Sequence, residues 1–168
     1  MAPRHPATRT SRLLHEAWVA GSLASALSAL ALTWAGHREI RSSTAPLNAV
    51  SHWRWGNPAL RKRGFTGRHT LLGYAIHHCA SIWWAGIHAI ARHRHPRADQ
   101  TSTVLLGALT TSAVACVVDF KCTPQRLTPG FEHHLSRKAL AGVYLHFAAG
   151  LALGALSSRA TTSRNSRK

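Results

Sequence analysis

The chain has 168 residues, a length that suits one domain, and its 45% hydrophobic content and mean hydropathy of −0.09 are those of an ordinary soluble protein. It carries 21 Lys and Arg against five Asp and Glu, which gives a formal net charge of +16. Such a charge often indicates nucleic-acid binding, but here the basic residues avoid the apolar segments, which carry no charged face. This segregation predicts a membrane protein and argues against a nucleic-acid-binding one.

The chain begins with a short basic tail and a long apolar helix. Residues 1–12 contain two prolines and three arginines, and we expect them to form a disordered basic N-terminal tail. Residues 17–35 contain no charged residue, and the helix should begin somewhat earlier, so the first membrane span covers about 13–35. Because this run is too long for the core of a signal peptide, we expect it to be retained.

Residues 36–69 form a connection that is longer than a helix bundle needs. Pro46 is a typical residue for the first turn of a helix, and Trp53 and Trp55 are of the type that prefers the headgroup region of a bilayer. We therefore predict a short interfacial helix between the first and second spans.

Three more apolar stretches follow, each about as long as the roughly 20 residues that cross the hydrocarbon of a bilayer. We predict spans two, three and four at about 70–91, 101–118 and 137–158, followed by a basic C-terminal tail at 159–168. The alternating ten-residue pattern of barrel strands does not recur in the sequence. The predicted fold is thus all-α, a four-span transmembrane helix bundle forming one domain over residues 13–158.

The orientation of such a bundle should follow the distribution of Lys and Arg between its two sides. Ten of these residues would lie on the side of the termini and eleven on the other, so the counts do not decide the orientation. The basic tail after residue 158 favours cytoplasmic termini.

Helical spacing places small or polar residues on one stripe of every span. We predict polar side chains in the bundle interior at His77, Ser81, His88, Ser112, Asp119 and His146. We predict helix packing through Gly21, Gly73, Gly142, Gly150 and Gly154, the last two of which form a GxxxG motif. That motif can pack two helices of one chain together or join two copies of the chain. Trp53, Trp55 and Glu132 are predicted to be interfacial.

The intramembrane polar residues allow several functional interpretations, because a polar side chain inside a bilayer needs a partner or a function. The leading prediction is a structural or accessory membrane component in which these residues bond across helices. An alternative is a small transporter or proton-handling protein that uses Glu16, His77 or His78, Asp119 and His146.

Two interpretations involve a bound metal. His77 and His146 could be axial ligands of a haem iron held between facing helices, although no second matching pair of histidines accompanies them. The cluster from Glu132 to His134, with His93 and His95, lacks the spacing of a zinc site, and we expect these residues to be solvated at the interface.

Hydrolase and transferase motifs are absent from the sequence, and its few carboxylates do not supply an acid–base pair. We predict no enzymatic activity, no cofactor and no metal. The expected partners are anionic membrane lipids, together with a second copy or another membrane protein, and not nucleic acid.

Three stretches of the chain resemble a family of small, uncharacterised multi-pass proteins of the bacterial inner membrane. They are residues 45–53 (APLNAVSHW), residues 68–70 and 73–78 (RHT and GYAIHH), and Asp119 with residues 123–132 (TPQRLTPGFE). The resemblance covers most of the chain after its first dozen residues. It implies a multi-pass protein in a bacterial cytoplasmic membrane, and it implies no particular activity.

Overall fold

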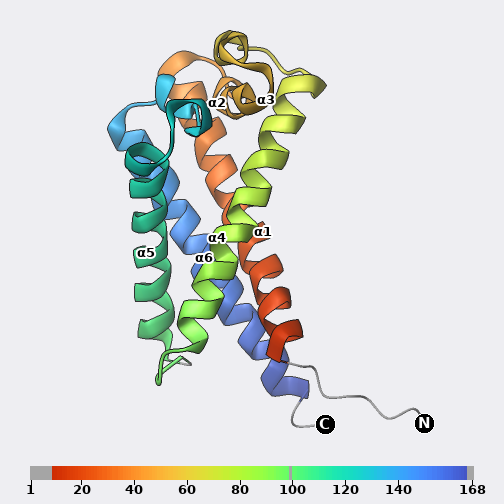
Figure 1. The fold of residues 1–168 in the computed structure, drawn as a ribbon, viewed down its shortest axis with the longest axis vertical. Coiled ribbons are helices and arrows are strands. Elements are labelled where there is room, and N and C mark those ends of the chain that lie inside the picture. The colour runs from red at the N-terminus through yellow and green to blue at the C-terminus, as the bar shows by residue number, and fades with distance from the viewer. Residues whose placement is uncertain (1–8, 99, 166–168) are drawn as a thin grey trace, which may run out of the picture.

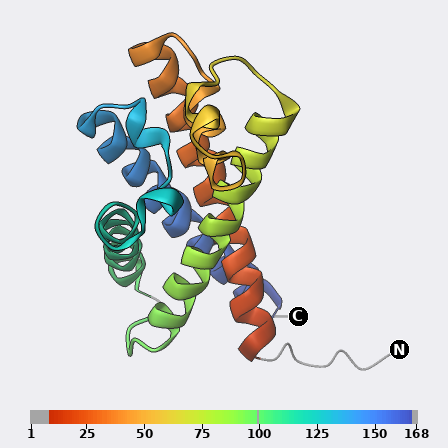
Figure 2. The same ribbon diagram turned by 45° about the horizontal axis from the view of Figure 1, so that its top comes forward.

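Four long helices form an up-down-up-down bundle in the computed structural model, which describes residues 9–98 and 100–165 (Figure 1). They are α1 (Arg9–Ile40), α4 (Leu72–His93), α5 (Thr101–Val117) and α6 (Arg137–Asn165). Within the described ranges all regular structure is helical, as the sequence predicts. The start of α1 and the end of α6 lie at one end of the bundle, and the short helices of the two long connections gather at the other (Figures 1 and 2).

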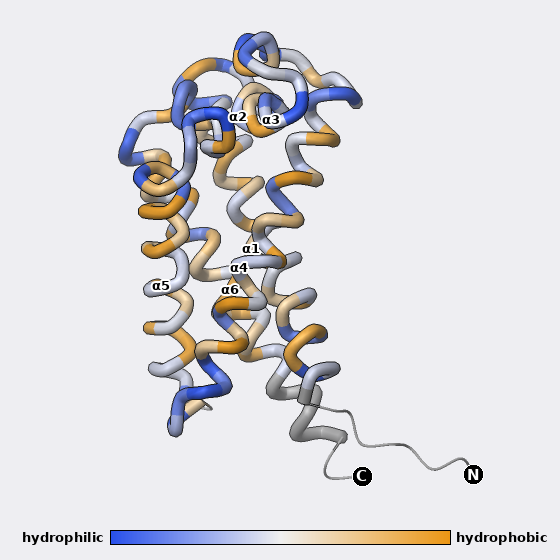
Figure 3. The backbone as a smooth tube through the Cα atoms, viewed as in Figure 1, coloured by the Kyte–Doolittle hydropathy of each residue, from blue (hydrophilic) through white to orange (hydrophobic). Residues whose placement is uncertain are grey.

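Within the part of the chain that the structure describes, three helical segments are by length and composition apolar enough to cross a membrane: Thr10–Ile40, Thr101–Cys122 and Arg137–Ser158. The fourth long helix, α4, has 22 residues, but it contains His77, His78 and His88, which lower its hydropathy. Figure 3 shows hydrophilic residues gathered where the connections meet and at the far end of α4, with apolar residues along the helices between.

The helices extend further than the apolar runs that define the predicted spans. The α1 helix begins at Arg9, inside the predicted N-terminal tail, and ends where Arg41 takes a left-handed φ of 55°. The α6 helix continues to Asn165, into the predicted C-terminal tail. Arginine and serine do not stop a helix that has already formed, which explains the extension. The rest of both predicted tails, residues 1–8 and 166–168, lies outside the described residues.

We call residues 41–71 and 118–136 the cap, because together they close one end of the bundle. The first part contains α2 (Ala45–Val50), α3 (His52–Trp55), the 3-10 helix η1 (Asn57–Arg61) and the π-helical turn η2 (Gly67–Leu71). The second part contains the π-helical turn η3 (Val118–Cys122) and the 3-10 helices η4 (Gln125–Leu127) and η5 (Phe131–His133).

The short helix predicted in this region is two helices, and the first of them is not a surface helix. All six residues of α2 are buried, and α2 packs against α1 and α4. Buried Asn48 ties the cap together: its Nδ2 donates to the carbonyl oxygens of Lys62 and Gly64, at 2.9 Å each, and its Oδ1 accepts from Thr70 Oγ1 at 2.6 Å. This side chain makes the bonds that a long irregular connection would otherwise lack.

Close helix contacts occur at four of the five predicted packing glycines. A Cβ at Gly150 or Gly154 would collide with the backbone of Ala24 or Ala20, so the GxxxG motif lets α6 approach α1 within one chain. Gly21 lies against Ile82 of α4 in the same way, and Gly73 lies against the Leu47 carbonyl of α2. The prediction is wrong for Gly142, which has open space where a Cβ would lie.

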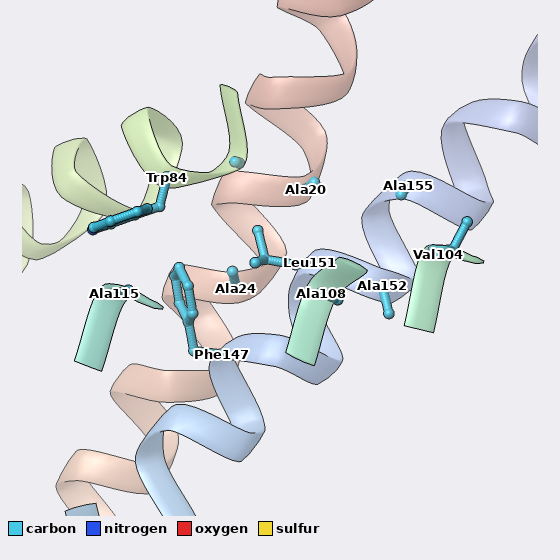
Figure 4. Close-up of a cluster of buried hydrophobic side chains, with 11 residues drawn as sticks. Ala20, Ala24, Trp84, Val104, Ala108, Ala115, Phe147, Leu151, Ala152 and Ala155 are labelled. Carbon is cyan, nitrogen blue, oxygen red and sulfur yellow. The ribbon is translucent and has the colours of Figure 1, made fainter. Parts of the chain in front are cut away.

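Small and medium-sized apolar side chains fill the bundle in two clusters. One lies midway along the helices and includes Ala20, Ala24, Trp84, Phe147 and Leu151 (Figure 4). The other lies nearer the cap and includes Leu32, Leu47 and Phe131. The many alanines explain how these helices come close enough for buried hydroxyl and imidazole groups to reach across.

Candidate binding cavity at the capped end

A cavity of about 80 Å³ lies inside the bundle directly beneath the cap. All four long helices contribute to its walls, and α2, η3 and η5 contribute near the cap. Its polar lining consists of Ser28, His77, Ser81, Asp119 and Tyr144. The other ten lining residues are apolar or aromatic, among them Trp53, Trp84, Phe131 and Phe147. We call this space the inner cavity.

The imidazole of His77 faces α1 across the cavity. Its Nε2 lies 2.9 Å from Ser28 Oγ, and Ser28 Oγ lies 2.6 Å from the Ala24 carbonyl oxygen. Because that carbonyl only accepts, the Ser28 hydroxyl donates its proton there and accepts the Nε2–H of His77. The backbone of Ser25 also bonds this imidazole. A neutral His77 thus keeps its proton on Nε2, and Nδ1 carries the lone pair.

The carboxylate of Asp119 is held from the opposite side of the cavity. The hydroxyl of Tyr144 on α6 donates to Asp119 Oδ2 at 2.6 Å, and Ser112 Oγ on α5 donates to the Tyr144 carbonyl oxygen at 2.6 Å. The first bond joins η3 to α6 and fixes the carboxylate at the cavity wall, and the second joins α5 to α6. Among the lining residues, Asp119 is the one acidic group.

A second polar cluster lies at the opposite end of the bundle. Glu16 of α1 accepts from Arg92 of α4 through both carboxylate oxygens, at 3.0 Å from Nε and 2.5 Å from Nη2. His93 Nε2 lies 2.8 Å from Glu16 Oε2. The side chains of Arg92 and Glu16 are only 2% and 4% exposed, so this is a buried, bidentate ion pair.

Buried His88 lies between this ion pair and the centre of the bundle. Its Nδ1 is 3.4 Å from Thr111 Oγ1 of α5, and Gly107 leaves room for the ring. No hydrogen-bond partner of its Nε2 is present among the described residues.

Apolar side chains separate the two polar clusters. Between Ser81 and His88, α4 carries Trp84 and Ala85, which belong to the apolar cluster that also contains Leu151. Figure 4 shows Trp84 and Leu151 in this cluster. Within the described part of the chain, a continuous polar path along the bundle is therefore not present in this conformation.

His146 does not face the bundle interior, so that prediction is wrong. Its side chain is exposed on the outside of α6, and its Nδ1 lies 2.8 Å from the Gly142 carbonyl oxygen. The helical stripe that suggested an inward position contains Gly142 and Gly150, of which only Gly150 meets a neighbouring helix. His77 and His146 consequently do not face one another, which excludes them as axial ligands of a single haem within one chain.

The predicted interfacial residues have different surroundings. Trp53 lines the inner cavity and donates from Nε1 to the Thr128 carbonyl oxygen at 2.8 Å. The ring of Trp55 lies 4.5 Å from the Arg54 guanidinium and 3.8 Å from that of Arg68, in two cation–π contacts. Glu132 is half-buried, and a hydrogen-bond partner of its Oε2 is missing from the described residues.

Nearby His134 is half-buried. Burial holds its pKa below the usual value, although a hydrogen bond with the Leu60 backbone and the carboxylate of Glu132 act in the opposite direction. Groups of three or more side chains suited to holding a metal ion do not occur among residues 9–98 and 100–165.

Two residues that build these sites, Tyr144 and Arg92, are not among the candidates that the sequence predicts, whereas Ser28 lies on the predicted small stripe of the first span with Gly21. Tyr144 brings a hydroxyl group into an uncharged segment, and Arg92 follows His88 by one helical turn. The interior stripe of α4 therefore continues through Arg92, four residues after His88. The same helical spacing, continued past the last apolar residue, predicts that Arg92 faces inward.

Comparison with family models, with curated proteins and with solved structures found no match to this chain. The geometry of the inner cavity is what bears on function. Aliphatic and aromatic walls with one carboxylate, one imidazole and one phenol can bind a small molecule that has an apolar body and a polar or cationic group.

Proposed function

We propose that the protein crosses a bacterial cytoplasmic membrane four times, with α4 as the second span beside the three more apolar helices. The outward face of α4 supports this proposal, since Trp83, Ile87 and Ile90 are exposed while its polar residues His88 and Arg92 are buried. A helix whose apolar side chains face out and whose polar side chains face in suits a lipid environment. The resemblance to bacterial inner-membrane proteins supports the choice of membrane.

Along the bundle, α4 runs antiparallel to α1 over the same depth. Ser28 meets His77 near the cap, Gly21 meets Ile82 in the middle, and Glu16 meets Arg92 at the far end. If α1 crosses the bilayer, α4 passes through the same layers, which supports four crossings and places both termini on one side.

The activity that we propose is that of an accessory membrane component that binds a small organic amine in the inner cavity. The observation that carries this proposal is the placement of a single carboxylate, Asp119, in a cavity whose walls are otherwise mostly apolar and include four Trp and Phe rings. Aromatic faces attract cations, and a carboxylate accepts hydrogen bonds from an ammonium group. Within a low-dielectric bundle both interactions are stronger than in water.

Three small probes of equal length test this proposal: n-butylammonium, n-butanol and n-butyrate. We expect saturation-transfer NMR on the detergent-purified protein to detect butylammonium and to find butyrate weakest, because Asp119 repels an anion. The substitution D119N should weaken butylammonium binding by about tenfold, the loss expected when a charge-assisted hydrogen bond becomes a neutral one. H146A, on the outside of α6, is the matched control and should bind as the wild type does. Equal binding of all three probes, or an unchanged D119N, would contradict the amine proposal.

A second candidate function is proton handling, and one observation favours it. Two groups that can exchange protons, His77 and Asp119, line the same cavity, and a third, the Glu16–His93 pair, lies at the other end of the bundle. The apolar layer around Trp84 would have to open for protons to pass. We expect vesicles that contain the wild-type protein and an internal pH dye to acidify inside after the external pH is lowered, and to do so faster than vesicles that contain H77A or D119N. Identical rates for wild type, both variants and empty vesicles would exclude this activity.

A further inference from the structure

A second cavity, of about 300 Å³, lies in the cap and outside the helix bundle. One wall comes from α3 and η1, with His52 and Asn57, and the other comes from η4 and η5, with Gln125, Arg126 and His133. We call it the cap cavity. Its volume is within the range of known small-molecule sites, and it is more polar than the inner cavity. None of the activities proposed above uses it.

The side chains on both walls offer hydrogen-bond donors. The exposed guanidinium of Arg126 has no ion pair or hydrogen bond among the described residues. On the facing wall, His52 donates its Nδ1 proton to the Ala49 carbonyl oxygen at 2.8 Å, so the donor that this wall offers to a ligand is the amide of Asn57. The amides of Asn57 and Gln125 and the imidazole of His133 complete a set of groups that can donate from several directions.

The electrostatic environment of the cap cavity favours an anion. The cap contains eight Lys and Arg against two acidic residues, Asp119 and Glu132. Asp119 lines the inner cavity, where it accepts from Tyr144, and Glu132 does not line the cap cavity. A carboxylate that would compete for Arg126 is thus missing from the lining residues.

We propose that the cap cavity binds a phosphate group, carried either by an anionic phospholipid headgroup or by inorganic phosphate. Arginine presents a planar fork that matches two phosphate oxygens, and donors on the opposite wall suit the remaining oxygens of a tetrahedral group. A planar carboxylate would leave one wall unused. The position at the end of a membrane-spanning bundle brings a headgroup within reach of the cavity. This site does not depend on what the inner cavity binds.

Two probes separate the sources of the phosphate group. Full-length protein in a neutral detergent is titrated with inorganic phosphate and with the soluble lipid dihexanoylphosphatidylglycerol, and binding is followed by isothermal titration calorimetry. We expect saturable binding of at least one probe. The substitution R126Q should weaken it by about tenfold, since the guanidinium makes the charge-assisted bonds. R61Q removes an equal charge from an exposed position of η1 that does not line the cavity, and it should change the affinity less than twofold.

The relative affinities show whether the phosphate group comes from a lipid or from solution, and the two variants show whether it binds at Arg126. Stronger binding of the lipid identifies a headgroup site, and equal or stronger binding of free phosphate identifies a site for the soluble anion. An equal loss of affinity in R126Q and R61Q would overturn the proposal, because it would indicate diffuse attraction by the charge of the cap. Saturation by neither probe would overturn it as well.

Unchanged circular dichroism and gel-filtration profiles show that R126Q is folded. The substitution H133N, which keeps a polar group of similar size, provides a second test, and we expect it to lower the affinity less than R126Q does.

Discussion

Three polar side chains of the bundle interior have a hydrogen-bond partner on another helical segment. His77 bonds to Ser28, Asp119 to Tyr144, and Glu16 to Arg92. Such pairs satisfy groups that would otherwise be costly in a lipid environment, and they join α4 to α1 and η3 to α6. The buried Glu16–Arg92 ion pair has the largest desolvation cost of the three, because each charge has lost its water and is stabilised mainly by the other.

Removal of one member of this ion pair should therefore be strongly destabilising. We expect E16A to lower the free energy of unfolding by about 3–5 kcal/mol, because it leaves the Arg92 guanidinium buried without its counterion. Chemical denaturation in detergent micelles, followed by circular dichroism, measures this loss. The double variant E16M/R92M, which removes both charges and keeps the volume, should regain most of it. If E16A were as stable as the wild type, the pair would be solvated rather than buried.

At the scale of the helices, α1 and α6 approach one another closely at two glycines of α6. Gly150 and Gly154 lie on the backbone of Ala24 and Ala20, so this interface has no room for a side chain. Gly142, two turns earlier on α6, belongs to the same sequence stripe but faces open space. The curvature and crossing of two helices keep only part of such a stripe in contact, which spacing along one helix does not reveal.

This difference supplies a matched pair of substitutions. G154V should destabilise the protein by about 1–3 kcal/mol or more, because the new side chain forces α6 away from α1. G142V carries the same change in helix propensity without the collision, and its melting temperature in detergent should stay close to that of the wild type. Equal melting temperatures for the two variants would mean that α1 and α6 are not packed at Gly154.

On the scale of the whole molecule, the two candidate binding cavities lie toward the same end of the bundle. Both the inner cavity and the cap cavity adjoin the long connections, whereas the opposite end is closed by a short link and the Glu16–Arg92 pair (Figure 1). Long connections that carry binding groups on a rigid helical scaffold are common in proteins. The proposed four crossings would put both cavities on the same side of the membrane.

Reporter fusions test this topology. Alkaline phosphatase, active only after export, and green fluorescent protein, fluorescent in the cytoplasm, are fused in turn after residues 63, 97, 126 and 165. Four crossings predict that fusions after 97 and 165 behave alike and that those after 63 and 126 show the opposite behaviour. If the fusions after 63 and 97 behaved alike, α4 would not cross the membrane, and the bundle would contain only the three more apolar spans.

The sequence by itself determined the helical class and the approximate positions of the long helices, because uncharged runs of about 20 residues and their basic flanks are local properties. It also identified His77, Ser81 and Asp119 as interior candidates, and the structure brings these three to one cavity. Only the tertiary structure decided which stripe residues meet a neighbour: His146 faces outward, Arg92 is buried, and α2 enters the bundle. The physical reason is that helical spacing defines a face, whereas the partner of that face depends on how the helices cross and on segments distant in sequence.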